Sequence, residues 1–335
     1  MYKSIVESCD TYYYTLARDM GVDLMHDQMK PLGFGQITGI DILGESRGVL
    51  PSTEWKRTTY KKPEQQRWYS GETISLGIGQ GYNSFTMLQI AHAMGTVANN
   101  GLKMKPHLVR EVVDVETKLS TPVAKEPVGQ LPLTPENLEI IKKGMVGVNI
   151  EGTSATSFIG APYASAGKTG TAQVFTVKQN EKYNASTIDE RMRDHALFVA
   201  FAPADDPKVA LAMVVENAGF GAQNAAPIAR RVFDFVIMGQ YPSQEDIEAV
   251  QKGQATRPIG KPRAVASVPW PPKAAELAVE EPVVAASAAE KAASAAAAKA
   301  ASAASTPSAP ASAAAKPASA TRATGAASAP KSAGR

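Results

Sequence analysis

The sequence predicts an α+β fold in which an antiparallel sheet is flanked by helices. Three segments with the apolar pattern of strands follow one another at 168–177, 195–203 and 208–216. The last two are joined by "ADDP", a tight-turn sequence, so they should pair as an antiparallel hairpin. A helical pattern at 225–238 follows this hairpin, and further helical patterns precede the strands.

The first helix is expected at residues 11–20, where Asp10 or Thr11 would cap its start and Gly21 would end it. Residues 22–72 are rich in glycine, proline and charged side chains. This stretch is therefore expected to be loop with a few short strands.

The second helix is expected within residues 84–99, because its apolar residues recur at helical spacing. These residues are Met87, Leu88, Ala91, Met94, Val97 and Ala98. Either Asn83 or Ser84 is expected to cap the start of this helix, and Asn100-Gly101 to stop it.

The remaining elements are a strand and two helices. Residues 107–115 alternate in polarity like a strand. Residues 134–150 form an amphipathic helix with Thr134 as its cap and Pro135 in its first turn. The helix at 225–238 is expected to end at Gly239, just past its last apolar residue.

A change in composition near residue 242 divides the chain into two parts. Residues 1–241 are expected to form one folded domain, whereas residues 242–335 form an Ala/Ser/Pro/Lys-rich tail that can bury little apolar surface and is expected to be disordered. Residues 251–335 carry 11 Lys and Arg against 4 Asp and Glu. A basic tail can attract nucleic acid or anionic lipid, but a soluble tether is the favoured interpretation, and no nucleic-acid partner is predicted.

Neither a disulfide nor a metal site is predicted. Cys9 is the only cysteine, and the four histidines show no paired ligand spacing, so no cofactor is expected. No apolar run approaches the roughly 18 residues of a membrane helix. The N-terminus has no apolar signal-peptide core either.

The segment "AGKTGTAQV" at 166–174 contains a Gly-Lys-Thr that could suggest a phosphate-binding loop. Such a loop needs a glycine where Pro162 stands, and it opens a helix, whereas this segment begins a strand. The glycines of "GIGQG" at 77–81 also miss dinucleotide-binding spacing, because Tyr82 stands where a third glycine is required. A tight turn before the helix within 84–99 is the favoured interpretation of those glycines.

Lys-Thr-Gly-Thr at the start of a strand is also typical of acyl-transfer enzymes that use a serine nucleophile. In such enzymes the strand binds a peptide along its edge, the lysine supplies a positive charge, and the threonine hydroxyls bind a carboxylate. The tripeptide alone is a weak signal. A companion motif is present in the required order, because Ser8-Cys9-Asp10 directly precedes the first helix. Taken alone, Ser8 or Asp10 would be interpreted as a helix cap.

Four segments together carry a resemblance to a known family. They are "SCDTYYYTLARDMG", "FGQITGIDILGESRGVLP", "SLGIGQGYNSFTMLQIAHAMGTVANNG" and "SAGKTGTAQ". They resemble the transpeptidase domain of class B penicillin-binding proteins, and most closely its elongation-specific peptidoglycan D,D-transpeptidases. The resemblance runs from residue 1 to about 240 and does not extend to the tail.

The resemblance implies a penicillin-binding-protein/β-lactamase-like transpeptidase fold that is incomplete at its N-terminus. It implies an enzyme at the periplasmic face of the inner membrane that cross-links peptidoglycan stem peptides ending in D-Ala-D-Ala. A serine would form an acyl-enzyme, β-lactam antibiotics would acylate the same serine, and the partners would be membrane proteins of the elongation complex. Such an enzyme would function in cell-wall elongation and cell shape.

The resemblance also assigns roles to residues of the two motifs. Ser8 would relay protons to the leaving group, and Asp10 would orient Ser8 or the substrate. Lys168 would stabilise charge in the site and help to hold Ser8.

Three residues on the same strand would bind the substrate. Thr169 and Thr171 would contact the substrate carboxylate, and the Thr171 N–H would supply half of the oxyanion hole. Gly170 would keep the strand accessible.

The family's nucleophile lies in a Ser-x-x-Lys motif that precedes the Ser-x-Asp motif. Only seven residues precede Ser8 here. Ser165 to Lys168 fits the pattern, but Lys168 already serves in the other motif. Ser328 to Lys331 also fits but lies in the tail, so both are interpreted as chance matches. The chain is therefore expected to be a C-terminal fragment without a nucleophile, unable to form an acyl-enzyme alone.

Two alternatives remain open. The chain could be an inactive truncated pseudoenzyme or a remnant that only binds partners. A β-lactamase or D,D-carboxypeptidase of the same fold is disfavoured, because the glycine-rich segment at 77–101 resembles the class B group.

Overall fold

A three-stranded antiparallel sheet forms the frame on which the site is built. A computed structural model describes residues 1–174, 184, 188–254 and 256–268, which lie within one compact unit, Met1–Trp270. Its strands are β5 (Ala166–Ala172), β6 (His195–Ala202) and β7 (Val209–Val215), in the order β5-β6-β7. The predicted hairpin of the last two strands is confirmed.

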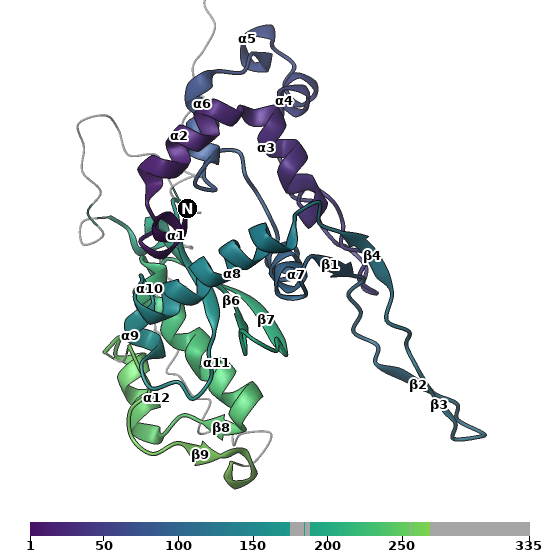
Figure 1. Cartoon of the computed structure of the whole chain (residues 1–335), viewed down its shortest axis with the longest axis vertical. Coiled ribbons are helices and arrows are strands. Elements are labelled where there is room, and N and C mark those ends of the chain that lie inside the picture. The colour runs from purple at the N-terminus through teal and green to yellow at the C-terminus, as the bar shows by residue number, and fades with distance from the viewer. Residues whose placement is uncertain (175–183, 185–187, 255, 269–335) are drawn as a thin grey trace, which may run out of the picture. The chain divides into compact units, whose positions relative to one another are not determined.

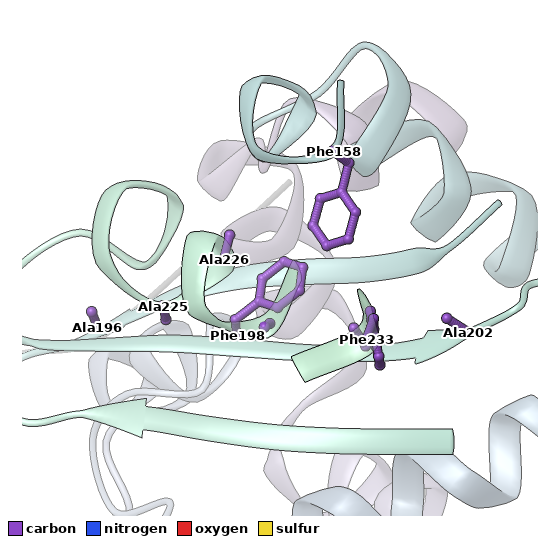
Figure 2. Close-up of a cluster of buried hydrophobic side chains, with 9 residues drawn as sticks. Phe158, Ala196, Phe198, Ala202, Ala225, Ala226 and Phe233 are labelled. Atoms are coloured by element: carbon purple, nitrogen blue, oxygen red, sulfur yellow. The ribbon is translucent and has the colours of Figure 1, made fainter. Parts of the chain in front are cut away.

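Helices cover one face of this sheet through a cluster of aromatic and alanine side chains. Side chains on β6 alternate between the two faces, so Phe198 points to this cluster and Phe201 to the opposite face. Phe198 packs against Phe158 of α9 (Ala155–Phe158), with ring centroids 5.8 Å apart (Figure 2). Phe233 of α11 (Ala226–Met238) completes the aromatic part of the cluster.

The opposite face of the sheet is covered by α7 (Met87–Ala98) and α8 (Pro135–Ile150) (Figure 1). Phe201 packs there against Met145 and Val148 of α8 and Ala98 of α7. The N-terminal helix α1 (Tyr2–Val6) lies against α8, and the side chain of Ile5 joins the same cluster. The predicted fold class, an antiparallel sheet flanked by helices, is confirmed.

The N-terminal region contains more helix than the sequence predicts. The predicted first helix is present as α2 (Asp10–Met20) and ends at Gly21 as expected. The prediction of loop over 22–72 is wrong, because four helices form there. They are α3 (Val22–Met29), α4 (Thr53–Thr59), α5 (Pro63–Gln66) and α6 (Ser70–Leu76), with a 3₁₀ turn η1 at Lys30–Leu32. None exceeds eight residues, so none is long enough to show a clear helical period.

The starts of α7 and α8 are both capped by a threonine side chain. Thr86 caps α7 by accepting from the Gln89 N–H, so the expectation of Asn83 or Ser84 is wrong. The Gln89 side chain accepts from the Thr86 N–H in return, which completes a capping box. Thr134 caps α8 as predicted.

Two ribbons follow α7. Strands β1 (Leu102–Met104) and β4 (Pro127–Gln130) pair antiparallel, and so do β2 (Glu111–Val113) and β3 (Ser120–Pro122). In Figure 1 the β2–β3 ribbon extends away from the three-stranded sheet. The strand predicted at 107–115 is therefore present only at its centre.

The fold continues past residue 241. Helix α12 (Gln244–Gln251) follows β8 (Gln240–Tyr241), which pairs with β9 (Arg263–Ala264). This corrects the expectation of disorder for residues 244–251, which are held by the bonds of the buried Asp246. Most of the predicted tail, residues 269–335, lies outside the described residues. Among the helices that are described, none combines the length and the apolar character needed to cross a membrane.

Candidate active site

A cavity of about 750 Å³ opens beside β5, where this strand meets the start of α2 and the segment after α6. All six residues singled out from the sequence line it: Ser8, Asp10, Lys168, Thr169, Gly170 and Thr171. The first two lie about 160 positions before the others in the chain, so the fold brings the two motifs together. The helix α10 (Gly221–Asn224) contributes Gly221 and Ala222 to the wall.

Ser8 occupies a sharp turn between α1 and α2. Its φ of 54° lies in the left-handed region, which a residue other than glycine adopts at a cost of about 1 kcal/mol. Asp10 begins α2, but the N-cap position belongs to Cys9 and no side chain caps this helix. The interpretation of Ser8 or Asp10 as a helix cap is therefore wrong, and both side chains are available to the cavity.

Lys168 connects the two motifs. Its Nζ donates to Ser8 Oγ at 2.7 Å and to the backbone carbonyl oxygen of Thr169 at 2.9 Å. Burial lowers the pKa of Lys168 from 10.5 to about 8, and the negative charge of Asp10 opposes this shift. A lysine of this kind carries a charge at neutral pH and releases its proton more readily than a surface lysine.

The outer edge of β5 faces the cavity, because the sheet order places β5 at one end. The carbonyl oxygens of Thr169 and Thr171 both accept bonds from side chains on this side. In an antiparallel strand the N–H and C=O of one residue point the same way, so the N–H of Thr171 also points to this edge.

The hydroxyl of Thr169 is paired with that of Thr153, and their Oγ1 atoms are 2.7 Å apart. Thr153 lies in the turn after α8 and lines the cavity, yet the sequence analysis did not identify it. Its only signal is that it follows Gly152 directly at the end of a predicted helix, which is common in proteins.

Gln80 is the second residue that the sequence analysis missed. Its Nε2 donates to the Thr171 carbonyl oxygen at 2.7 Å, and its Oε1 accepts from the Gln173 N–H at 3.3 Å. It lies within "GIGQG", which was interpreted as a tight turn, and that interpretation is confirmed. Gly79 and Gly81 have φ of 79° and 72°, values that glycine adopts without strain.

Apolar side chains also line the cavity. They are Ile5 of α1, Met94 of α7, Ile141 and Met145 of α8, and Val199 of β6. Low polarity around charged and polar groups strengthens their electrostatic interactions. Within the described residues, no group of three or more His, Cys, Asp and Glu side chains could hold a metal ion.

The polar residues that line the cavity could carry out acyl or proton transfer. They present a serine hydroxyl bonded to a lysine of lowered pKa, a carboxylate, and a strand edge with an outward N–H. A cation and N–H donors on one side of a cavity stabilise negative charge that develops on a bound carbonyl. The strand edge itself suits an extended peptide.

Comparisons with known proteins agree with these features. Residues 1–234 match the family described as "Penicillin binding protein transpeptidase domain". The chain is 42% identical over 248 residues to peptidoglycan D,D-transpeptidase MrdA of Haemophilus influenzae, which covers 72% of this chain and 37% of that protein. The MrdA of Escherichia coli K12 is 41% identical over 240 residues, with 71% and 37% covered.

Solved structures show the same similarity. The penicillin-binding protein PBP2 of Pseudomonas aeruginosa, in complex with WCK 5153, superposes with a TM-score of 0.59 at 38% identity over 71% of this chain and 47% of that one. PBP2 of Helicobacter pylori in complex with MreC gives a TM-score of 0.57 at 28% identity, covering 71% and 40%. The chain thus spans about 37% of the length of the curated relatives named above.

Proposed function

The chain belongs to the penicillin-binding protein transpeptidase family, and from this membership we propose that it forms part of a peptidoglycan D,D-transpeptidase of the PBP2 type. The observation that carries the proposal is the 2.7 Å bond between Lys168 Nζ and Ser8 Oγ on the wall of a cavity that also contains the β5 edge. The substrate would be a stem peptide ending in D-Ala-D-Ala, which lies extended along β5.

The reaction is a two-step acyl transfer. A serine oxygen attacks the carbonyl carbon of the penultimate D-Ala, the C–N bond to the terminal D-Ala breaks, and the leaving amine takes up a proton. The amine of a second stem peptide then attacks the ester carbonyl, loses a proton, and releases the serine. The products are a cross-linked peptide and free D-Ala.

Each residue of the wall has a role in this scheme. Ser8 passes the proton to the leaving amine, and Lys168 holds Ser8 and stabilises negative charge. Asp10 orients Ser8 or the substrate. The family resemblance and the contacts of Lys168 support these roles.

The β5 residues bind the peptide. Thr169 and Thr171 contact its terminal carboxylate, and the Thr171 N–H donates to the carbonyl oxygen under attack. The loss of one such donor typically lowers the rate by about 10²–10³-fold. Gly170 has no side chain to obstruct the peptide.

We propose that the nucleophilic serine is not among residues 1–335. Ser165 matches a Ser-x-x-Lys spacing with Lys168, but it is buried and its Oγ accepts a hydrogen bond from Asn149 Nδ2 at 2.9 Å. Lys168 itself is bonded to Ser8. The second match, at Ser328, lies outside the described residues.

The ligands, partners and location follow from the same family membership. β-Lactams would acylate the serine that attacks the peptide. One relative has been solved with MreC and another within a peptidoglycan synthase complex. We therefore propose that the full-length enzyme binds membrane proteins of the elongation complex at the periplasmic face of the inner membrane.

Acylation by a fluorescent penicillin tests the proposal directly. The 335-residue chain should remain unlabelled, whereas a fusion that places the Ser-x-x-Lys segment of the H. influenzae relative ahead of residue 1 should be labelled at that serine. Lys168→Ala in the fusion should slow labelling by roughly 10²-fold or more, because its charge and its bond to Ser8 are lost.

Each contrary result has its own meaning. Labelling of the 335-residue chain at a defined serine would refute the external nucleophile. A folded fusion that is never labelled would favour the pseudoenzyme or partner-binding alternative. Rapid hydrolysis of penicillin or release of D-Ala without cross-linking would favour a β-lactamase or D,D-carboxypeptidase.

A further inference from the structure

The outer edge of β5 is only partly free. The residues that face it are Thr169, Thr171 and Gln173, because their backbone groups bond to side chains on that side. Lys168 Nζ occupies the Thr169 carbonyl oxygen. The Gln80 side chain occupies the Thr171 carbonyl oxygen and the Gln173 N–H, and it does not occupy the Thr171 N–H, which lies between the carbonyl oxygens of Thr169 and Thr171. A peptide that adds to β5 therefore finds some of the backbone groups of the edge already bonded to side chains.

The side-chain amide of Gln80 meets two backbone groups of the β5 edge that an added strand would use. It gives one donor to Thr171 and takes one N–H from Gln173, at 2.7 and 3.3 Å. Two neighbouring outward residues of a strand offer this pair of groups to an antiparallel partner. The side chain is thus bound where the backbone of an added strand would lie.

The segment that carries Gln80 is held in place by its neighbours. Gly77 packs so closely on α2 that a Cβ there would clash with the Tyr13 carbonyl oxygen and the Ala17 side chain. The Asn83 side chain donates to the carbonyl oxygens of Leu76 and Gln80, each at 3.3 Å. Gln80 therefore reaches β5 from a fixed turn.

We propose that Gln80 competes with the substrate for the Thr171 carbonyl oxygen and so determines which peptides bind the β5 edge. The proposal rests on the proposed function, because it assumes that a D-Ala-D-Ala peptide pairs with Thr171. If the Thr171 N–H bonds to the carbonyl of the penultimate D-Ala, the N–H of that same D-Ala faces the Thr171 carbonyl oxygen. The Gln80 Nε2 occupies this acceptor in the free protein.

A consequence for selectivity follows. A ligand gains full benefit from the Thr171 N–H, which Gln80 leaves alone. It gains less from an N–H of its own, because it must share the Thr171 carbonyl oxygen with the Gln80 amide or displace that amide. With Gln80 present, the affinity of a ligand depends mainly on its carbonyl oxygen. The difference in affinity between an amide and an ester at the same position is therefore reduced.

Two ligands that differ in one atom test this competition. The first is diacetyl-L-Lys-D-Ala-D-Ala, and the second replaces the N–H of its penultimate residue by an ester oxygen. Their dissociation constants are measured by NMR titration of the 335-residue chain. The ratio of ester to amide dissociation constants should be small for the wild type and roughly 2–10-fold larger for Gln80→Ala, which is the factor that one net hydrogen bond provides.

Two further variants make the test specific. Gln80→Glu keeps an acceptor for the Gln173 N–H but has no donor for Thr171, so its ratio should rise as in Gln80→Ala even if the alanine variant loosens the turn. Gln36→Ala is the matched control, because Gln36 Nε2 also donates to a backbone carbonyl oxygen, that of Lys30 at 2.9 Å, away from the cavity. Its ratio should equal that of the wild type.

The outcomes separate this inference from the function on which it rests. Equal ratios in the wild type, Gln80→Ala and Gln80→Glu would overturn the competition while leaving peptide binding intact. Failure of every folded variant and of the wild type to bind either ligand would refute the peptide site itself. Thermal melting of each variant establishes that it is folded.

Discussion

At the scale of single residues, Lys168 shows a conflict between stability and the role proposed for it. Its side chain is held in a partly buried position because it must reach Ser8, and burial lowers its pKa to about 8. A lysine in water would keep its proton to about pH 10. The protonated form of Lys168 is therefore less favourable in the folded protein than in the unfolded chain.

The sign of the resulting pH dependence follows from this shift. Below pH 8 the lysine is protonated in both states, so the full cost of burying its charge is present. Between about pH 8 and 10.5 only the unfolded chain keeps the proton, and the cost diminishes as the pH rises. Lys168→Met should therefore be more stable than the wild type at pH 7, by at most about 3 kcal/mol, and the difference should shrink by pH 10.

Urea unfolding of both proteins at pH 7 and pH 10 measures this difference. Titratable groups that the two proteins share cancel when their free energies of unfolding are subtracted. A stability difference that does not change between the two pH values would contradict the assigned pKa. The variant should also lose affinity for ligands with a carboxylate, since the cavity loses its cation.

Not all site residues could be recognised from the sequence. Ser8, Asp10 and the four β5 residues stand in short motifs whose chemistry is specific in combination. Gln80 and Thr153 stand in no such motif. Each contacts an atom of β5 at 2.7 Å, and the contacted residue lies 91 positions from Gln80 and 16 positions from Thr153 in the sequence. Such contacts are properties of the fold, and one sequence does not reveal them.

At the scale of elements, α10 and β5 lie in direct backbone contact. A Cβ at Gly221 would clash with the carbonyl oxygens of Leu197 and Gly170. The absence of a side chain at Gly221 therefore lets α10 approach both β5 and β6.

Gly221→Ala is therefore expected to lower the free energy of unfolding by about 1–3 kcal/mol, the usual cost of inserting a methyl group into a packed region. It should also weaken ligand binding, because Gly170 lies on the cavity wall. Gly71→Ala is the matched control, since nothing lies within 4 Å of its added Cβ and the residue is in helix α6. The stability of Gly71→Ala should equal or slightly exceed that of the wild type. Equal effects of the two substitutions in thermal unfolding would refute the close contact at Gly221.

Elements with strong local signals were predicted well. The strands β6 and β7 and the helices α7, α8 and α11 have clear periods, and α8 has its predicted cap. Helices α3 to α6 were missed because each is four to eight residues long and is stabilised by packing rather than by its own pattern. Ser52, which caps α4 by accepting from the Trp55 N–H at 2.9 Å, is a local signal that could have indicated this helix.

At the scale of the whole described unit, residues beyond 241 are joined to the transpeptidase region by a buried ion pair. Arg231 of α11 makes two bonds to Asp246 of α12, at 2.8 and 2.6 Å. Asp246 is fully buried and also accepts from the Ile259 N–H. The domain boundary at 241 remains a prediction, and this pair makes it testable.

Asp246→Ala should lower the free energy of unfolding by about 3–5 kcal/mol, because it leaves the guanidinium of Arg231 buried without its partner. Denaturant unfolding should show one transition that shifts as a whole if residues 242–268 are integral to the fold. Glu248→Ala, an exposed change in the same helix, should shift it by less than about 0.5 kcal/mol. An unchanged main transition in Asp246→Ala would show that the domain ends near 241.

The position of β5 at the end of the sheet has a consequence for the solubility of the protein. An edge that admits a substrate peptide would also admit a strand of another molecule, which is a common route to aggregation. Lys168 and Gln80 occupy two outward carbonyl oxygens of this edge, and the Lys168 side chain is charged at neutral pH. The residues proposed to process and select the peptide thus also protect the open edge against association between copies of the chain.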